Sequence, residues 1–109
     1  MIFHVKSQRK TLVPLSIILH KVKDRHWISR TTALIGEEKL NKLINSHVLV
    51  VGLGGIGSYA AEFIARAGVG KMTIVDGDVV DPTNRNRQLP ALSSTHGKSK
   101  ADLMEERLR

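Results

Sequence analysis

The segment that most restricts the possible folds is an apolar run over residues 48–51 that ends directly in GLGGIG, residues 52–57. A short continuous run of β-branched and aliphatic residues is typical of a parallel strand buried on both faces. We expect Gly52 to permit a tight turn, Gly54 to let backbone N–H groups approach a phosphate, and Gly57 to let the next helix pack closely. With Gly55, these are the candidate nucleotide-binding glycines, set at a helix N-terminus that attracts anions.

The residues after the glycines predict a strand, helix, strand unit with a right-handed crossover. Residues 56–67 have a helical pattern, with Gly68 as its C-terminal stop, and residues 72–75 form a second strand that ends at Asp76. Asp76 lies about 20 residues beyond the glycines, where a carboxylate accepts hydrogen bonds from ribose hydroxyls. This position suits NAD and ATP equally.

The predicted fold class is α/β: the N-terminal part of a Rossmann-like doubly wound parallel sheet, preceded by a short helix over roughly residues 37–44. A polar loop covers residues 77–97, and a helical pattern resumes over residues 98–109. A doubly wound sheet needs more than two strands, and the last helix has no following strand to cover. We therefore expect residues 26–109 to be a truncated part of a longer domain.

Residues 1–25 are expected to be an appended basic arm. The formal charge is +7, and residues 1–30 hold seven Lys and Arg against a single acid, Asp24. Charge confined to one arm gives only a weak indication of nucleic-acid contact or of an organellar presequence. Since a valine codon at Val22 could serve as initiator, we expect residues 1–21 not to be translated.

Composition excludes several classes of function. The chain has no cysteine, and its five histidines lack paired spacing, so neither disulfides nor a metal site within these residues is expected. The apolar run over residues 12–19 is too short to span a membrane. A cytoplasmic location is the default expectation.

The polar segment over residues 76–88 favours ATP over a dinucleotide. A dinucleotide brings only a diphosphate, which the helix end already holds, whereas a triphosphate needs further cations. Arg87 is suited to bidentate contact with phosphate oxygens, and Lys100 supplies a second charge from the following helix. A nicotinamide-dependent oxidoreductase remains an alternative.

At these positions the sequence resembles the ubiquitin-activating-enzyme-like adenylating family, which includes ThiF, MoeB and HesA. The resemblance runs from about Ser29 to Arg109. It rests on six motifs: SRT at 29–31, IGEE at 35–38, the glycine loop, DGD at 76–78, TNRNRQ at 83–88 and GKSK at 97–100.

This resemblance implies that ATP binds with Mg²⁺ and that a substrate carboxylate attacks the α-phosphate, releasing pyrophosphate. Asp76 would hold the ribose, and Asn84, Arg87 and Lys100 the phosphates, with Arg87 and Lys100 also catalytic. Arg30 stands where the family places an arginine that reaches into the partner subunit's site, which implies a homodimer. The metal-binding aspartate would lie beyond Arg109.

Within the family, NRQLPAL at 86–92 and GKSKAD at 97–102 look most like the tRNA threonylcarbamoyladenosine dehydratases. These enzymes adenylate the carboxylate of a modified adenosine in tRNA, which then cyclises with loss of water. Two alternatives stay open: an adenylyltransferase acting on a ubiquitin-like sulfur carrier protein, and a non-catalytic fragment that only binds nucleotide.

Overall fold

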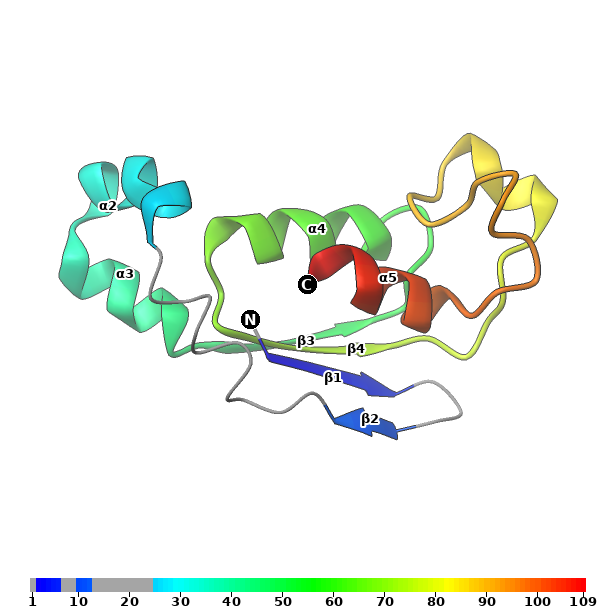
Figure 1. Ribbon diagram of the computed structural model, residues 1–109, viewed down its shortest axis with the longest axis horizontal. Coiled ribbons are helices and arrows are strands. Elements are labelled where there is room, and N and C mark those ends of the chain that lie inside the picture. The colour runs from blue at the N-terminus through cyan, green and yellow to red at the C-terminus, as the bar shows by residue number, and fades with distance from the viewer. Residues whose placement is uncertain (1, 7–9, 13–24) are drawn as a thin grey trace.

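The computed structural model describes residues 2–6, 10–12 and 25–109, and shows helices packed on one face of a four-stranded sheet (Figure 1). The elements in chain order are β1 (Ile2–Lys6), β2 (Lys10–Leu12), η1 (His26–Ile28), α2 (Ser29–Ile35), α3 (Glu37–Ile44), β3 (His47–Val51), α4 (Gly57–Ala67), β4 (Lys71–Val75), η2 (Pro82–Asn86) and α5 (Lys100–Leu108). The strand order in the sheet is β2-β1-β4-β3. In the described part of the chain, no helix is long and apolar enough to cross a membrane.

The predicted strand, helix, strand unit is β3-α4-β4. The two strands are parallel, with His47 paired to Lys71 at one end and Val51 to Val75 at the other. Helix α4 ends at Gly68, whose φ of +104° is a left-handed conformation that only glycine adopts without strain. The α/β class and the Rossmann-like start of the fold are confirmed.

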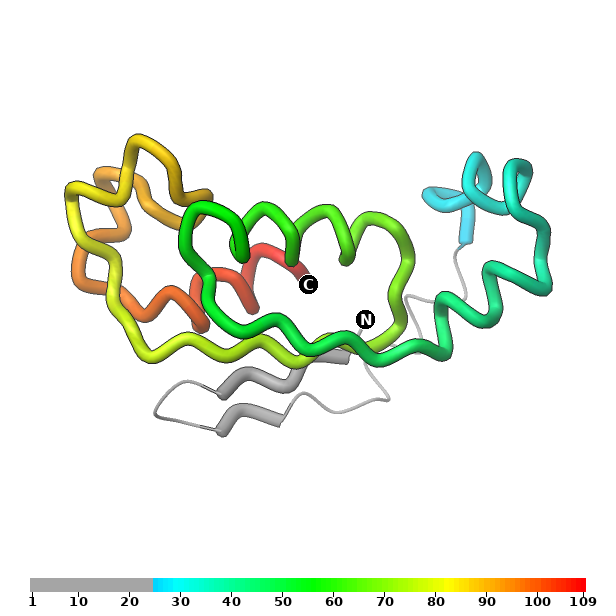
Figure 2. Tube along the Cα trace, turned by 180° about the vertical axis from the view of Figure 1, so that it is seen from behind, coloured from blue at the N-terminus to red at the C-terminus, as the bar shows by residue number. Residues whose placement is uncertain are grey.

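The expectation that the first apolar strand is buried on both faces is wrong. Strand β3 lies at one edge of the sheet, and only Val50 in it is buried. Leu49 and Val51 are 61% and 71% exposed. The reason is that α4 and α5 cover one face of the sheet, and no described element covers the other (Figures 1 and 2).

Two strands in the N-terminal segment were not indicated by the sequence pattern. Strand β1 pairs in parallel with β4, and β2 pairs antiparallel with β1. Helix α5 packs against α4 and against two strands, β1 and β4, so the helix covers part of the sheet although no strand follows it in the sequence. Residues 7–9 and 13–24 lie outside the described part, and the prediction that residues 1–21 are not translated stays a prediction.

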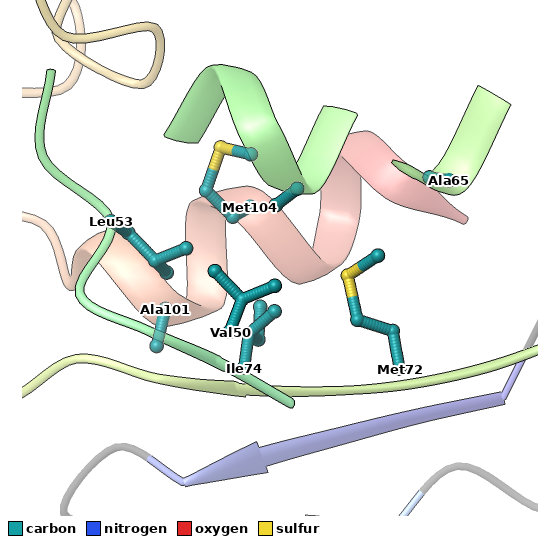
Figure 3. Packing of buried hydrophobic residues seen from close by; sticks show 8 residues of the cluster. Val50, Leu53, Ala65, Met72, Ile74, Ala101 and Met104 are labelled. Atoms are coloured by element: carbon teal, nitrogen blue, oxygen red, sulfur yellow. The ribbon is translucent and has the colours of Figure 1, made fainter. Parts of the chain in front are cut away.

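The hydrophobic core lies between the sheet and the two helices above it (Figure 3). Leu53, Met72, Ile74 and Met104 are fully buried there. Alanines on the facing sides of the helices allow α4 and α5 to approach the strands. Ala61, Ala65 and Ala101 are all buried in this cluster.

The helices before β3 pack at the opposite end of the sheet from the glycine loop (Figure 1). Helix α3 has the bounds that the sequence pattern indicated, whereas η1 and α2 were not foreseen. The turn between α4 and β4 fits closely beneath α3. A Cβ on Gly70 would lie only 1.6 Å from the Ile44 carbonyl oxygen.

An ion-pair cluster fastens α4 to α5. Glu62 is buried and accepts hydrogen bonds from Arg107 Nε at 2.5 Å and from Arg66 Nε at 3.1 Å. The hydrogen bond from Arg107, more than that from Arg66, holds the pKa of Glu62 below its ordinary value of 4.5. Because the folded-state pKa is lowered, the cluster stabilises the fold above about pH 4.5 and loses this effect as the pH falls through the folded pKa.

Replacing Glu62 by Gln should therefore lower the free energy of unfolding by about 1–2 kcal/mol at pH 7, a modest value because both arginines reach solvent. The difference from wild type should shrink toward pH 3. Urea unfolding at both pH values measures it, with Glu106→Gln on the exposed side of α5 as the matched control. An equal loss at both pH values would contradict the assignment to the ionised carboxylate.

Candidate nucleotide-binding site

The glycine loop joins β3 to α4. At two of its positions the backbone geometry strongly disfavours any residue with a side chain. Gly52 has a φ of +86°, and its N–H donates to the Val75 carbonyl oxygen at 2.8 Å, which closes the turn against β4. A Cβ on Gly57 would lie 1.7 Å from the Gly52 carbonyl oxygen. The start of α4 can therefore approach the loop only if residue 57 is glycine.

Gly54 and Gly55 are not required by packing in the same way. A Cβ at these positions would meet the side chains of Gln88 and Arg87 at 3.6 and 3.5 Å, which are ordinary contact distances. Nothing among the described residues therefore forces glycine there. Close approach of a ligand to the backbone stays the predicted reason for both.

Asp76 connects the glycine loop to the segment after β4. Its Oδ2 accepts a hydrogen bond from the Leu53 N–H at 2.6 Å, and its Oδ1 accepts one from the Asp78 N–H at 2.7 Å. Each carboxylate oxygen has two lone pairs, so both oxygens keep acceptor capacity. The carboxylate is thus held at the carboxyl end of β4 in an arrangement compatible with the predicted contact to ribose.

The polar loop after Asp76 is more ordered than the sequence indicated. It contains the 3₁₀ helix η2, whose capping box joins Asp81 and Asn84: the Asp81 N–H donates to Asn84 Oδ1 at 2.9 Å. The hydroxyl and backbone N–H of Thr83 lower the pKa of Asp81. Asn84 is buried, and within residues 25–109 no hydrogen bond uses its Nδ2, which leaves two N–H donors for a ligand.

Ser58 holds this polar loop against the glycine loop, a role that sequence reasoning missed. The fully buried hydroxyl donates to the Gly54 carbonyl oxygen and accepts a hydrogen bond from the Leu89 N–H at 3.2 Å. The one available signal was a serine four residues after Gly54, a spacing at which a hydroxyl bonds back to a helical carbonyl.

Replacing Ser58 by Ala should lower the free energy of unfolding by about 1–3 kcal/mol, because the Leu89 N–H loses its acceptor. Thermal unfolding measures the effect. The control is Ser46→Ala, which removes one hydrogen bond to the Lys42 carbonyl at the other end of the sheet. Equal effects of the two substitutions would show that Ser58 does not connect the loops.

Two side chains of the polar loop lie over the glycines. The aliphatic part of Arg87 covers Gly55, and its Nη1 donates to the Asn86 side chain at 3.0 Å and to the Thr83 carbonyl at 3.3 Å. The neighbouring Gln88 covers Gly54. The structure thus places Arg87 beside the glycine loop, as the sequence predicted. It also places Gln88 there, which the sequence analysis had not named as a site residue.

Lys100 opens helix α5 and is only 5% exposed. Its Nζ lies 3.8 Å from Asp78 Oδ2, and its backbone N–H donates to the Asp78 carbonyl at 3.1 Å. Since Asp78 is in turn bonded to Asp76, the lysine belongs to the same cluster as the glycine loop. A nearly buried ammonium with one distant carboxylate partner is suited to an anionic ligand.

Arg30 is not part of this cluster. It lies exposed on α2, at the end of the sheet opposite the glycine loop (Figures 1 and 2). Its predicted action in the site of a second copy stays a prediction. In residues 25–109, His, Asp and Glu side chains form no group of three that could hold a metal ion.

The sequence was compared with protein families and with known proteins. Residues 28–109 match the ThiF family. A tRNA threonylcarbamoyladenosine dehydratase of Bacillus subtilis is 55% identical over 83 residues, which are 76% of this chain and 33% of that protein. The adenylyltransferase and sulfurtransferase uba4 of Aspergillus clavatus is 40% identical over 103 residues, 94% of this chain and 20% of that protein.

Among solved structures, the tRNA N6-threonylcarbamoyladenosine dehydratase of Escherichia coli in complex with ATP superposes with a TM-score of 0.75. The sequence identity is 46%, over 78% of this chain and 35% of that one. The chain therefore spans about a third or less of the length of these relatives.

Proposed function

The chain belongs to the ThiF family, and from that premise we propose that it holds ATP as the nucleotide-binding part of an enzyme that adenylates a carboxylate. The observation that carries the proposal is the joined cluster of Asp76, Asp78 and the nearly buried Lys100 beside the glycine loop. It combines backbone N–H donors and a helix N-terminus with a lysine whose ammonium favours an anion.

In the proposed reaction a carboxylate oxygen bonds to the α-phosphorus of ATP, the bond to the bridging oxygen breaks, and pyrophosphate leaves with that electron pair. The N-terminus of α4 would orient the phosphates. Lys100 and Arg87 would stabilise the negative charge that shifts onto the leaving oxygens. Asn84 would donate its free Nδ2 hydrogens to the same phosphates.

We propose the modified adenosine of threonylcarbamoyl-tRNA as the carboxylate substrate. Support comes from the dehydratases of Bacillus subtilis and Escherichia coli, which match at 55% and 46% identity, against 40% for uba4. Ring closure at the adenylated carboxyl carbon would then release AMP, which carries away one carboxylate oxygen, and the product would be the cyclised nucleoside with a net loss of water. A ubiquitin-like sulfur carrier is the second candidate, because the uba4 match extends over more of this chain.

The distance of Arg30 from its own glycine loop supports a homodimer in which each copy gives this arginine to the other's site. A single copy would then bind ATP without its full set of cations. Sedimentation with and without ATP would test assembly. Mixing an Arg30→Ala chain with a Lys100→Met chain should restore part of the activity that each lacks alone.

Exchange of labelled pyrophosphate into ATP tests the reaction and its substrate together. The protein should be assayed as the 109-residue chain and as any longer product of its coding sequence. Exchange that depends on threonylcarbamoyl-tRNA is the expected result. Exchange that depends on a sulfur carrier instead would select the second candidate, and no exchange by the longer product with either would overturn the adenylation proposal.

A further inference from the structure

Strand β1 comes from outside the family match but has an internal place in the sheet. The match to the ThiF family begins at residue 28, whereas β1 spans Ile2–Lys6. It lies between β4 and β2, so a strand pairs with it on each side. The pairing with β4 is parallel and continuous, from Ile2 opposite Lys71 to Lys6 opposite Val75. It is as long as the pairing of β4 with β3.

In a doubly wound sheet, the place that β1 occupies belongs to a different strand. The first three strands of such a sheet lie side by side in chain order, and each is reached through a crossover helix. Here β3 is the first strand and β4 the second, so the third place lies beyond β4, and the helix that precedes it is α5. The third strand would run parallel to β4. Strand β1 has that place and that direction, although it comes before β3 and β4 in the chain.

Helix α5 covers this third place as a crossover helix would, because it packs against both β4 and β1 (Figure 1). Strand β1 also pairs with the row of backbone N–H and C=O groups along β4, which would otherwise be open to another strand. Strand β2 then forms the outer edge of the sheet. It has only three residues, and so short an edge offers little template for further pairing.

We propose that the edge of β4 is a binding site for an extended segment that runs parallel to it, and that the N-terminal strand β1 is its resident ligand. This is strand addition within one chain. Main-chain hydrogen bonds supply the affinity, so another segment with the same direction can compete for the edge. The order of the fold identifies a strand that follows α5 as the natural competitor, and only one of the two can occupy the edge at a time. A product that began at Val22 would leave the edge open.

Paired cysteines test the position of β1 in the full 109-residue chain, which has no cysteine of its own. His4→Cys with Thr73→Cys changes two register partners, whose Cα atoms in a sheet lie about 4.8 Å apart, within the span of a disulfide. The matched control is His4→Cys with Leu49→Cys, because Leu49 is the partner of Thr73 on β3 and lies one strand further away. In oxidised glutathione the first pair should form its disulfide at least about tenfold faster than the second. Equal rates would overturn the proposal.

Capture of a synthetic peptide tests whether the β4 edge binds a strand from elsewhere. The peptide has the sequence of residues 1–12 with His4→Cys, and the full chain carries Thr73→Cys. In the chain, Val5→Pro removes a backbone N–H from β1 and should open the edge, whereas the matched control Val5→Thr keeps that donor.

The proline variant should form about tenfold more mixed disulfide with this peptide than the threonine variant, in which the resident strand has the advantage of a high effective concentration. A peptide with Lys6→Cys in place of His4→Cys is out of register with Thr73 and should be captured poorly by both chains. Equal capture of the first peptide by both chains, or capture by neither, would overturn the proposal. Equal capture of the two peptides by the proline variant would also overturn it. The cysteine pair within one chain leaves Val5 unchanged, so its result does not depend on how the proline variant folds.

Discussion

Replacing Gly57 by Ala should lower the free energy of unfolding by about 3 kcal/mol and abolish nucleotide binding. The added methyl group would lie 1.7 Å from the Gly52 carbonyl oxygen and 2.8 Å from its carbonyl carbon. Both atoms belong to the backbone, so α4 must move away from the loop rather than a side chain rotating aside. In a domain with a typical stability of roughly 5–15 kcal/mol, a loss of this size is severe.

The matched control is Gly77→Ala. A Cβ there has no neighbour within 4 Å, and the backbone φ is not in the left-handed region. Its unfolding midpoint in urea should stay close to wild type or rise slightly, since alanine restricts the unfolded chain. If Gly57→Ala were as stable as Gly77→Ala, the close approach of α4 to the loop would not exist in solution.

Replacing Lys100 by Met should raise the dissociation constant for ATP by roughly 10–100-fold, because the substitution removes one charge-assisted contact from a site shielded from solvent. The unliganded chain should keep its unfolding temperature, because an apolar side chain of similar length replaces a nearly buried ammonium. Asp78, the partner left behind, is 79% exposed at its side chain and stays solvated.

Lys98→Met is the control for Lys100→Met. Lys98 lies two residues earlier and is exposed, so its removal changes the net charge equally without touching the cluster. Its effect on ATP binding should be less than about twofold and should disappear as salt is added. Equal weakening by the two substitutions would mean that ATP responds to overall charge rather than to Lys100.

Local sequence patterns were sufficient to predict the positions of the glycine loop and of the elements that flank it. The periodicity of α4, the stop at Gly68 and the apolar run of β4 each depend on neighbouring residues, so their positions could be predicted closely. Asp76 and Arg87 also lie beside the glycine loop, because short connections carry them there, and their contacts with a nucleotide stay predictions. Lys100 lies in the same cluster because its backbone N–H donates to the Asp78 carbonyl, which fixes the start of α5.

Long-range packing could not be predicted in the same way. The pairing of β1 with β4 joins segments nearly 70 residues apart. Three of the five residues of β1, Ile2–Lys6, favour strands, but so short a segment does not indicate which strand it pairs with. The exposure of Leu49 and Val51 depends on what covers the second face of the sheet, which a run of apolar residues cannot indicate. Ser58 and Gln88 acquire their roles only when the polar loop folds back over the glycines.

The most direct test of the central claim is calorimetric titration of the 109-residue chain with ATP and, separately, with NAD. The account predicts one ATP bound per chain, more tightly than NAD, with the binding weakened in Lys100→Met and not in Lys98→Met. Tighter binding of NAD than of ATP, or no binding of ATP by a folded chain, would contradict it.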